Sequence, residues 1–200
     1  MKSAYGYFEA NTAIICRALQ SIQREPMERL IADCEETLRA GRRIIASGLG
    51  KNVPICEKFE GTMLSLGLDA NFLHTNSAVH GDMGMVREGD LVILLTKSGS
   101  TAESVYLAGL LKERAGVKLW LLSFMERSAL ADCMENKLII RLEHEGDLWD
   151  VIPNNSTTLN LIVLQTVAIE LSKRMGLSLE RDFKPNHPGG AIGAQLSHGE

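Results

Sequence analysis

The sequence is short of aromatic residues, of positive charge and of long apolar runs. Aromatic residues make up 5% of the 200 positions, hydrophobic residues 45% and charged residues 23%, which is the composition of an ordinary soluble globular protein. No apolar stretch reaches the roughly 18 residues that a membrane span needs, so we expect no membrane partner. The net charge of -4 provides no basic surface for a polyanion, and we therefore expect no nucleic acid partner.

Cysteine is scarce as well, and its spacing argues against a disulfide framework. Cys16, Cys34, Cys56 and Cys133 lie far apart and form no C-x-x-C motif, so we expect reduced thiols. Residues 1–5 lack the apolar core and the small-residue cleavage site of a signal peptide. Together these features lead us to expect a cytoplasmic protein.

Short apolar runs alternate with amphipathic stretches from residue 41 onward. Runs such as 92–95 and 119–122 are apolar at every position, which a strand covered on both faces requires. The pattern predicts a single α/β domain over residues 1–200, with two helices in residues 1–40 and a sheet core with a site-bearing tail in 41–200. We expect strands at 43–47, 71–74, 90–96, 118–123 and 137–142, and helices at 4–23, 26–40, 52–66, 101–113, 128–133 and 157–175.

Three turns rich in glycine and small hydroxyl residues each lead into a predicted helix. Two of them follow predicted strands, and in open parallel sheets ligands collect outside the carboxyl ends of the strands. Such turns aim backbone N–H groups and hydroxyls at an anion, so the sequence predicts a phosphate site. The turns are Ser47-Gly48-Leu49-Gly50-Lys51, Ser98-Gly99-Ser100-Thr101 and Ser156-Thr157-Thr158.

These turns also have a purely structural explanation. The residues from Ser100 to Glu103 match a capping box, in which Ser100 and Glu103 would satisfy the first amides of a helix. The motif Gly48-x-Gly50-Lys51 matches neither the phosphate loop of nucleotide-binding proteins nor the dinucleotide fingerprint. Neither ATP nor NAD is therefore expected.

Five residues are candidates for chemistry: Lys51, His80, Glu103, Glu145 and His187. The two histidines lie in glycine-flanked loops, where a side chain more often faces a cleft than a core. Glu145 belongs to a charged segment, 143–147, that would also suit a solvated loop. A metal site could be drawn from His80, Asp82, His144 and His187, but no pair has the spacing typical of zinc ligands, so we expect no metal.

Several motifs in order along the chain resemble the sugar isomerase (SIS) family, and within it the arabinose-5-phosphate isomerases. The likeness runs from about residue 42 to residue 196. It rests on Gly48-x-Gly50-Lys51, His80-Gly81-Asp82-Met83-Gly84-Met85, Ser98-Gly99-x-Thr101-x-Glu103, Ser156-Thr157-Thr158 and His187-Pro188-Gly189-Gly190-Ala191-Ile192-Gly193.

The resemblance implies a five-stranded parallel sheet of flavodoxin-like topology and interconversion of D-ribulose 5-phosphate with D-arabinose 5-phosphate without a cofactor. It also implies a homotetramer in which a histidine completes a neighbouring subunit's site. The family's active-site lysine, loop histidine, two glutamates and tail histidine fall on Lys51, His80, Glu103, Glu145 and His187. Its phosphate-binding positions fall on Ser47, Gly48, Ser98, Ser100 and Thr101, with Ser156 and Thr157 lining the same cleft.

The sequence departs from the family pattern in three ways. Arabinose-5-phosphate isomerases usually continue into a pair of CBS domains, whereas the sequence stops at Glu200, so we expect no regulation through such domains. The loop 146–155 differs from the usual family sequence and is a place where substrate choice could change. Lys97 stands where the family often has asparagine, which adds positive charge beside the predicted anion.

The implied mechanism is proton transfer through a cis-enediolate. A partly buried carboxylate suits this task, because its proton affinity lies nearer the working pH; the sequence leaves open whether Glu103 or Glu145 is the base. Lys51 would stabilise the developing negative charge, and His187, assisted by His80, would move protons between oxygens or open a cyclic sugar. The alternatives are 6-phospho-3-hexuloisomerase or another phosphosugar isomerase, a non-catalytic sugar-phosphate binding module, and an inactive subunit.

Overall fold

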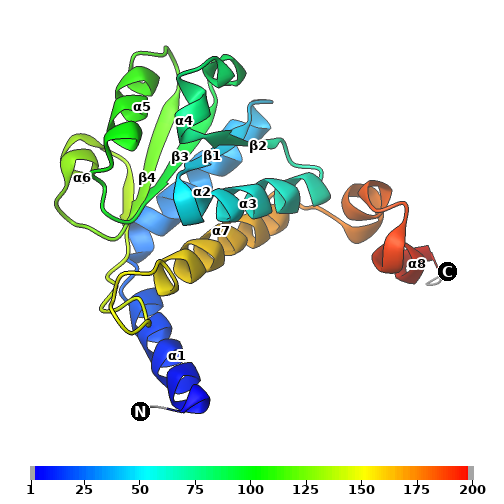
Figure 1. Ribbon diagram of the computed structural model, residues 1–200. Coiled ribbons are helices and arrows are strands. Elements are labelled where there is room, and N and C mark those ends of the chain that lie inside the picture. The colour runs from blue at the N-terminus through cyan, green and yellow to red at the C-terminus, as the bar shows by residue number, and fades with distance from the viewer. Residues whose placement is uncertain (1–2, 198–200) are drawn as a thin grey trace.

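A sheet of five parallel strands forms the centre of residues 3–197, the part of the chain that the computed structural model describes (Figure 1). Its strand order is β2-β1-β3-β4-β5, and every pairing is parallel. This is the flavodoxin-like order, so the predicted fold is confirmed. The strands are β1 (Ile44–Gly48), β2 (Ala70–His74), β3 (Leu91–Thr96), β4 (Lys118–Ser123) and β5 (Lys137–Ile139).

Helices cover both faces of the sheet and make a three-layer arrangement. Two helices, α1 (Ala4–Gln20) and α2 (Arg24–Arg39), precede the first strand, as the sequence predicts. The remaining long helices are α3 (Val53–Ser65), α5 (Ala102–Lys112) and α7 (Asn155–Arg174), with short helices α4 (Thr75–Ala78) and α6 (Ala129–Cys133).

The side chains of β3 show why the strands are apolar at every position. Leu91, Ile93 and Leu95 pack into a core shared with α1, α2, α3 and α7, whereas Val92 and Leu94 pack against α4, α5 and α6 on the other face. Successive side chains of a strand point to opposite faces, and here both faces are covered. The strand is therefore buried along its whole length.

The last strand is shorter than predicted. The sequence favours a strand over 137–142, but β5 ends at Ile139. The amide of Ile140 still donates to the carbonyl of Ser123 on β4, and the next amide, from Arg141, donates to the hydroxyl of Ser21 in the α1–α2 turn. The chain leaves the sheet here because its backbone groups find partners in that turn.

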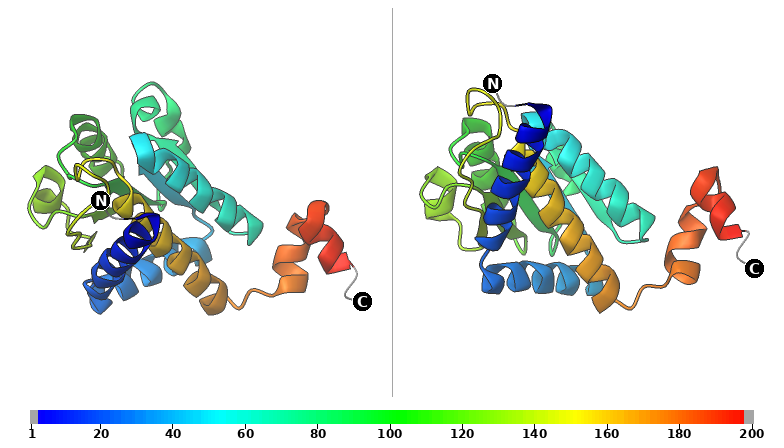
Figure 2. Two further views of the ribbon diagram at one scale, coloured as in Figure 1. Left: turned by 60° about the horizontal axis from the view of Figure 1, so that its bottom comes forward. Right: turned by 90° about the horizontal axis from the view of Figure 1, so that it is seen from below.

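Two segments predicted as loops contain short helices. The segment around His80 includes α4 and the 3-10 turn η2 (Asp82–Met85). The tail after α7 contains η3 (Leu179–Phe183), η4 (Lys184–Asn186) and α8 (Gly190–Ser197). It projects beyond the sheet (Figure 2) and contacts the end of α3, where Asn186 Nδ2 donates to the Ser65 carbonyl at 3.3 Å. Segments this short carry too few residues for a clear hydrophobic period.

Two cysteines are buried and two are exposed, and all four are free. Burial raises the pKa of the Cys56 thiol to about 12. Among residues 3–197 no helix is long and apolar enough to cross a membrane. The assignment of residues 1–200 to one domain stays a prediction, since residues 1–2 and 198–200 lie outside the described part.

Candidate active site

A cleft of about 360 Å³ opens where the strand order of the sheet reverses, between β1 and β3. The connections after these two strands run in opposite directions, which leaves a crevice at their carboxyl ends. Its walls come from the turn after β1, the end of β3, the first turn of α5 and the first turns of α7. The lining residues are Leu49, Gly50, Lys51, Asn52, Leu95, Thr96, Lys97, Ser98, Thr101, Ser104, Pro153, Ser156, Thr157 and Asn160.

The turn after β1 carries Lys51 to the cleft. The 3-10 turn η1 (Gly50–Asn52) follows the strand directly, and a Cβ on Gly48 would lie 2.8 Å from the Cβ of Asn52, so only glycine allows this close packing. Ser47 is buried, and its hydroxyl lies 3.1 Å from that of Thr75, the first residue of α4. Ser47 and Gly48 thus support the turn from behind the lining.

The turn after β3 presents hydroxyl groups to the cleft. Ser98 Oγ accepts a hydrogen bond from the amide of Ser100 at 3.2 Å and lies 3.4 Å from Thr101 Oγ1. Gly99 has φ +62°, and a Cβ there would lie 2.2 Å from Ser128 Oγ. Ser98 and Thr101 line the cleft, whereas Ser100 is exposed outside it.

The capping box that the sequence allows at this turn does not form. Thr101, rather than Ser100, is the N-cap of α5, and its side chain makes no capping hydrogen bond. This shift puts Glu103 at the second helical position, one residue too early to reach back, and its side chain is exposed. The first amides of α5 have no acceptor within the helix. The side chains of Ser100 and Glu103, which would occupy amides at this helix start in a capping box, do not do so here.

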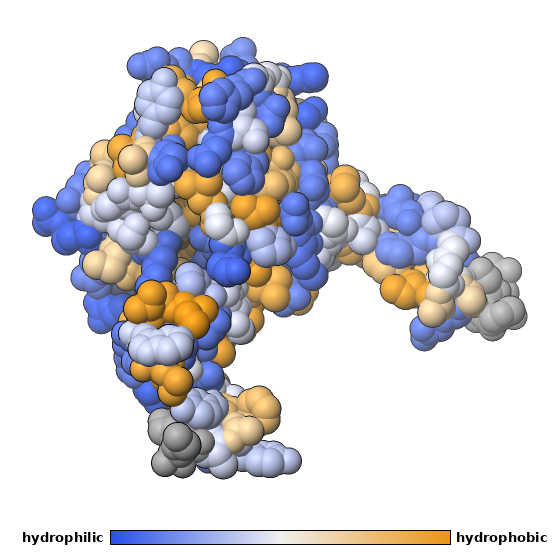
Figure 3. Space-filling model, viewed as in Figure 1, coloured by the Kyte–Doolittle hydropathy of each residue, from blue (hydrophilic) through white to orange (hydrophobic). Residues whose placement is uncertain are grey.

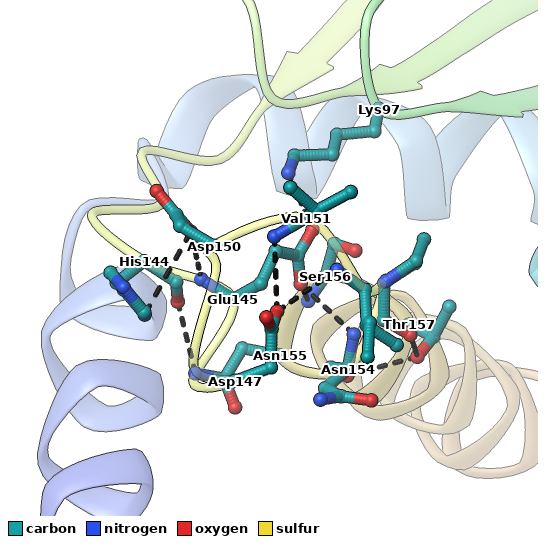
Figure 4. A network of polar contacts seen from close by, with 12 residues as sticks. Lys97, His144, Glu145, Asp147, Asp150, Val151, Asn154, Asn155, Ser156 and Thr157 are labelled. Atoms are coloured by element: carbon teal, nitrogen blue, oxygen red, sulfur yellow. Dashed lines mark hydrogen bonds and ion pairs between the residues drawn. The ribbon is translucent and has the colours of Figure 1, made fainter.

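The start of α7 binds a carboxylate of the protein itself. Glu145 Oε2 accepts hydrogen bonds from the amides of Asn154 (3.0 Å) and Ser156 (2.9 Å), as Figure 4 shows. The prediction that this third turn offers unpaired amides to an external anion is therefore wrong for Ser156. Ser156 still lines the cleft beside Thr157. The hydroxyl of Thr157 donates to the carbonyl of Asn154 at 2.9 Å.

Lys97 links this buried carboxylate to the cleft. Its Nζ lies 2.7 Å from Glu145 Oε1, while the Glu145 side chain is 0% exposed and that of Lys97 is 43% exposed. Within the described residues, Oε1 of Glu145 accepts no hydrogen bond of regular geometry, and its polar contact there is the ion pair with Lys97. Glu145 lies behind the cleft wall, and Lys97 forms part of that wall.

Two asparagines at the base of the cleft were missed by the sequence analysis. Asn160 Nδ2 donates to Asn52 Oδ1 at 2.9 Å, and Asn52 in turn donates to the carbonyl of Leu95 at 3.4 Å. Asn160 is buried, and its Oδ1 has no hydrogen-bond partner in residues 3–197. Its position four residues after Ser156 places both on one helix face, a signal that could have identified it.

The two candidate histidines lie outside the cleft lining of their own chain. His80 is exposed between α4 and η2. His187 lies in the tail, where its ring stacks on Phe183 with centroids 3.9 Å apart and its Nδ1 lies 2.8 Å from the Phe183 carbonyl oxygen. No group of three or more potential metal ligands comes together in the described part of the chain, so His80, Asp82, His144 and His187 form no cluster there.

The loop between Glu145 and α7 is held by its own aspartate. Asp147 accepts hydrogen bonds from the amides of Trp149 (2.7 Å), Ile152 (2.9 Å) and Val151 (3.1 Å). Desolvation opposes ionisation of Asp147, but these amide donors outweigh it and hold its pKa below the usual value. The loop nevertheless exposes Trp149 and Val151 to solvent. Figure 3 shows apolar residues among polar ones on the face that it draws.

The fold and the cleft define a flavodoxin-like α/β protein whose switch-point cleft gathers lysine, hydroxyl and helix N-terminal groups. A model of the SIS domain matches residues 37–170, and the chain therefore belongs to the SIS domain family.

Known relatives extend this assignment. The chain is 35% identical, over 179 residues, to the arabinose 5-phosphate isomerase KdsD of Pseudomonas aeruginosa, covering 90% of this chain and 54% of that protein. The chain thus spans about half the length of the curated relatives it matches. The solved structure of the c3406 protein of Escherichia coli CFT073, in complex with a sugar-phosphate ligand, is similar, with a TM-score of 0.78 and 30% identity, covering 90% of this chain and 95% of that one.

A third similar structure is the Vibrio vulnificus NanR protein complexed with ManNAc-6P. Its TM-score is 0.71 at 16% identity, covering 97% of this chain and 69% of that one. At this identity the likeness concerns the fold alone.

Proposed function

We propose that this protein is an aldose–ketose isomerase that interconverts D-ribulose 5-phosphate and D-arabinose 5-phosphate through a cis-enediolate, without a cofactor. The observation that carries the proposal is the switch-point cleft, where Lys51, Ser98 and Thr101 lie on the wall and the carboxylate of Glu145 lies directly behind it. The relatives named arabinose 5-phosphate isomerase support the substrate assignment.

The hydroxyl turn after β3 is the proposed phosphate anchor. Ser98 and Thr101 present hydroxyls at the start of α5, whose first amides point out of the helix toward the same space. Ser47, Gly48, Ser100, Ser156 and Thr157 complete the proposed set, as supports or neighbouring walls. Anchoring the phosphate fixes the reacting carbons against the catalytic groups, which can contribute several kcal/mol, on the order of 7–11 in favourable cases.

The proposed chemistry needs a base and a stabiliser of negative charge. The base removes the proton beside the carbonyl carbon and returns it to the neighbouring carbon, and a carboxylate does this from Glu145 or Glu103. The enediolate oxygens gain negative charge in the process. The ammonium of Lys51 on the cleft wall stabilises that charge more than it stabilises the ground state.

The proposal includes a site shared between subunits. His187 stacks on Phe183 in a tail that stands away from the cleft of its own chain, so it reaches a cleft most directly by entering that of a neighbouring copy. We propose a homotetramer in which His187 of one chain, with His80, moves protons between the substrate oxygens at another chain's cleft.

The experiment is incubation of the protein in deuterated water with a panel of pentose and hexose phosphates, followed by NMR. Deuterium at the second carbon of arabinose 5-phosphate, together with appearance of ribulose 5-phosphate, is the expected result. Exchange with a hexulose 6-phosphate instead would replace the proposed substrate with that of 6-phospho-3-hexuloisomerase.

The second candidate function is a sugar-phosphate binding module without turnover. It is favoured by the engagement of Glu145 with Lys97 and two amides, and by the position of Glu103 outside the cleft lining. In the same experiment this function would give a ligand-induced rise in melting temperature and no deuterium incorporation with any sugar phosphate.

A further inference from the structure

We propose that Lys97 binds the substrate's phosphate in exchange for Glu145, so that substrate binding withdraws the lysine from the buried carboxylate and leaves that carboxylate able to accept a proton. This inference rests on the proposed function and deepens it. It assigns a specific role to the ion pair between Lys97 and Glu145, and Lys97 is not part of the motifs that resemble the SIS family.

The position of Lys97 makes it available to a ligand. It directly precedes Ser98, the first hydroxyl residue of the turn after β3, and its side chain is 43% exposed on the cleft wall. A lysine carries its charge on a flexible four-carbon stem with three rotatable donors, so it can change partners without moving the backbone. The phosphate anchor proposed above lies one residue away along the chain.

Glu145, in contrast, is fixed. Its side chain is fully buried, and its Oε2 is bound to the amides of Asn154 and Ser156 at the start of α7. Its own amide donates to Asp150 Oδ1 at 2.7 Å, and its carbonyl accepts from the amide of Asn155 at 3.2 Å. Of the two partners in the ion pair, the half-exposed lysine has the side chain that can change its position.

The two oxygens of Glu145 are unequal. Oε2 has two amide donors, whereas Oε1 has Lys97 Nζ at 2.7 Å and no regular hydrogen bond within residues 3–197. While the lysine is present, Oε1 is engaged in the ion pair and is not open to a proton of the substrate. Once the lysine turns to the phosphate, Oε1 has no polar partner among residues 3–197 and is open to a proton of the substrate.

This exchange would coordinate binding and catalysis. Leaving a buried charge without its partner raises the free energy of the protein. Lys97 therefore leaves Glu145 only when the phosphate dianion of the substrate offers it a new partner, and Glu145 acts as the base only then. Lys97 is on this account a substrate-binding residue, and Glu145 competes with the substrate for it. The competition makes a prediction about affinity that a merely structural ion pair does not make.

The test measures the affinity of inorganic phosphate by calorimetry for the wild type, Lys97→Met, Glu145→Gln and the double variant. Loss of one charge-assisted contact should weaken phosphate binding about tenfold in Lys97→Met. Glu145→Gln should bind phosphate several-fold more tightly than the wild type, because Lys97 is no longer held by a carboxylate. Lys173→Met is the control, since Lys173 is an exposed lysine of α7 whose nearest acidic partner is on its own helix.

The double variant guards against loss of folding, because it removes both charges of the ion pair together and leaves no unpaired carboxylate in the interior. It should bind phosphate at least tenfold more weakly than Glu145→Gln. Equal phosphate affinities for Lys97→Met and Lys173→Met, or weaker binding by Glu145→Gln than by the wild type, would overturn the exchange. Absence of measurable phosphate binding by the wild type would overturn it too.

Turnover separates this inference from the proposed function. Lys97→Met should raise KM for the sugar phosphate more than it lowers kcat, whereas Lys173→Met should change neither. If the wild type exchanges deuterium into arabinose 5-phosphate but the phosphate affinities contradict the exchange, only the inference fails. If no sugar phosphate shows exchange, the proposed function fails.

Discussion

At the scale of single residues, the two candidate bases differ in their surroundings. Glu145 is fully buried beside the cleft, whereas Glu103 is exposed on α5 and does not line it. Glu145→Gln should lower kcat by about a hundredfold or more, in the range that general-base removal gives, and Glu103→Gln should cost less. Steady-state kinetics with arabinose 5-phosphate would measure both, and near-full turnover in both variants would rule out the carboxylate mechanism.

The sequence indicated which turns lie at the cleft but not which side chains have partners distant in sequence, and the roles of the site residues stay predictions. Lys51, Ser98 and Thr101 line the cleft as expected, because the carboxyl ends of β1 and β3 meet at the switch point. The contact between Lys97 and Glu145 spans two connections of the fold, and no local pattern encodes it. The same holds for the bond between Asn52 and Asn160.

At the scale of elements, the turn after β1 depends on close backbone packing. A Cβ at Gly48 would approach Asn52 Cβ to 2.8 Å and Cys56 Sγ to 3.3 Å, so Gly48→Ala must displace η1. We expect a loss of about 1–3 kcal/mol in stability, as for overpacked sites, and a rise in KM because Lys51 moves with η1. Chemical denaturation and kinetics would measure these changes.

The control for that variant is Gly61→Ala in α3. A Cβ at Gly61 meets nothing within 4 Å, so this change should stabilise the helix by about 0.5–1 kcal/mol and leave activity unchanged. Equal stability of the two alanine variants would contradict the packing argument.

The loop before α7 is an element held by one carboxylate. Asp147→Ala should speed hydrogen exchange at the amides of Trp149, Val151 and Ile152, which lose their acceptor, while amides within α7 keep their protection. NMR or mass spectrometry at pH 7 would measure this. Unchanged protection at these amides would contradict the role of Asp147.

The pH dependence of the same loop follows from the lowered pKa of Asp147. The stabilisation is fully present above the unfolded value of 3.8 and is lost only as the pH falls through the lower value of the folded state. The loop of the wild type should therefore keep its amide protection at pH 5. An ordering that weakened between pH 6 and pH 5 would have to come from another group.

The sequence predicted long elements better than short ones. The apolar runs of β3 and β4 and the apolar faces of α5 and α7 define elements that agree with the structure to within two residues at their ends. The short helices α4 and α8 carry less than three turns and depend on tertiary contacts. The end of β5 was set by a side chain of the α1–α2 turn, which no local pattern reveals.

At the scale of the whole molecule, the position of His187 predicts complementation between inactive subunits. Lys51→Ala removes a residue of the chain's own cleft, and His187→Ala removes one that lies outside it. If neighbouring copies share sites, the two inactive variants should regain part of the wild-type turnover when refolded together. Each variant refolded alone serves as the control, and a mixture as inactive as its components would contradict a site shared between neighbouring copies.

In the loop before α7, the side chains that face solvent are different from the residues that fix the backbone. Trp149 and Val151 point outward, while the loop's fixed geometry depends on Asp147 and on glycine at 146, where a Cβ would lie 2.1 Å from Asn11 Oδ1 of α1. The backbone conformation of the loop and the side chains on its exposed surface thus depend on different positions. Mutation can change what the exposed side of this loop presents to solvent or to another molecule while the backbone beneath it stays the same.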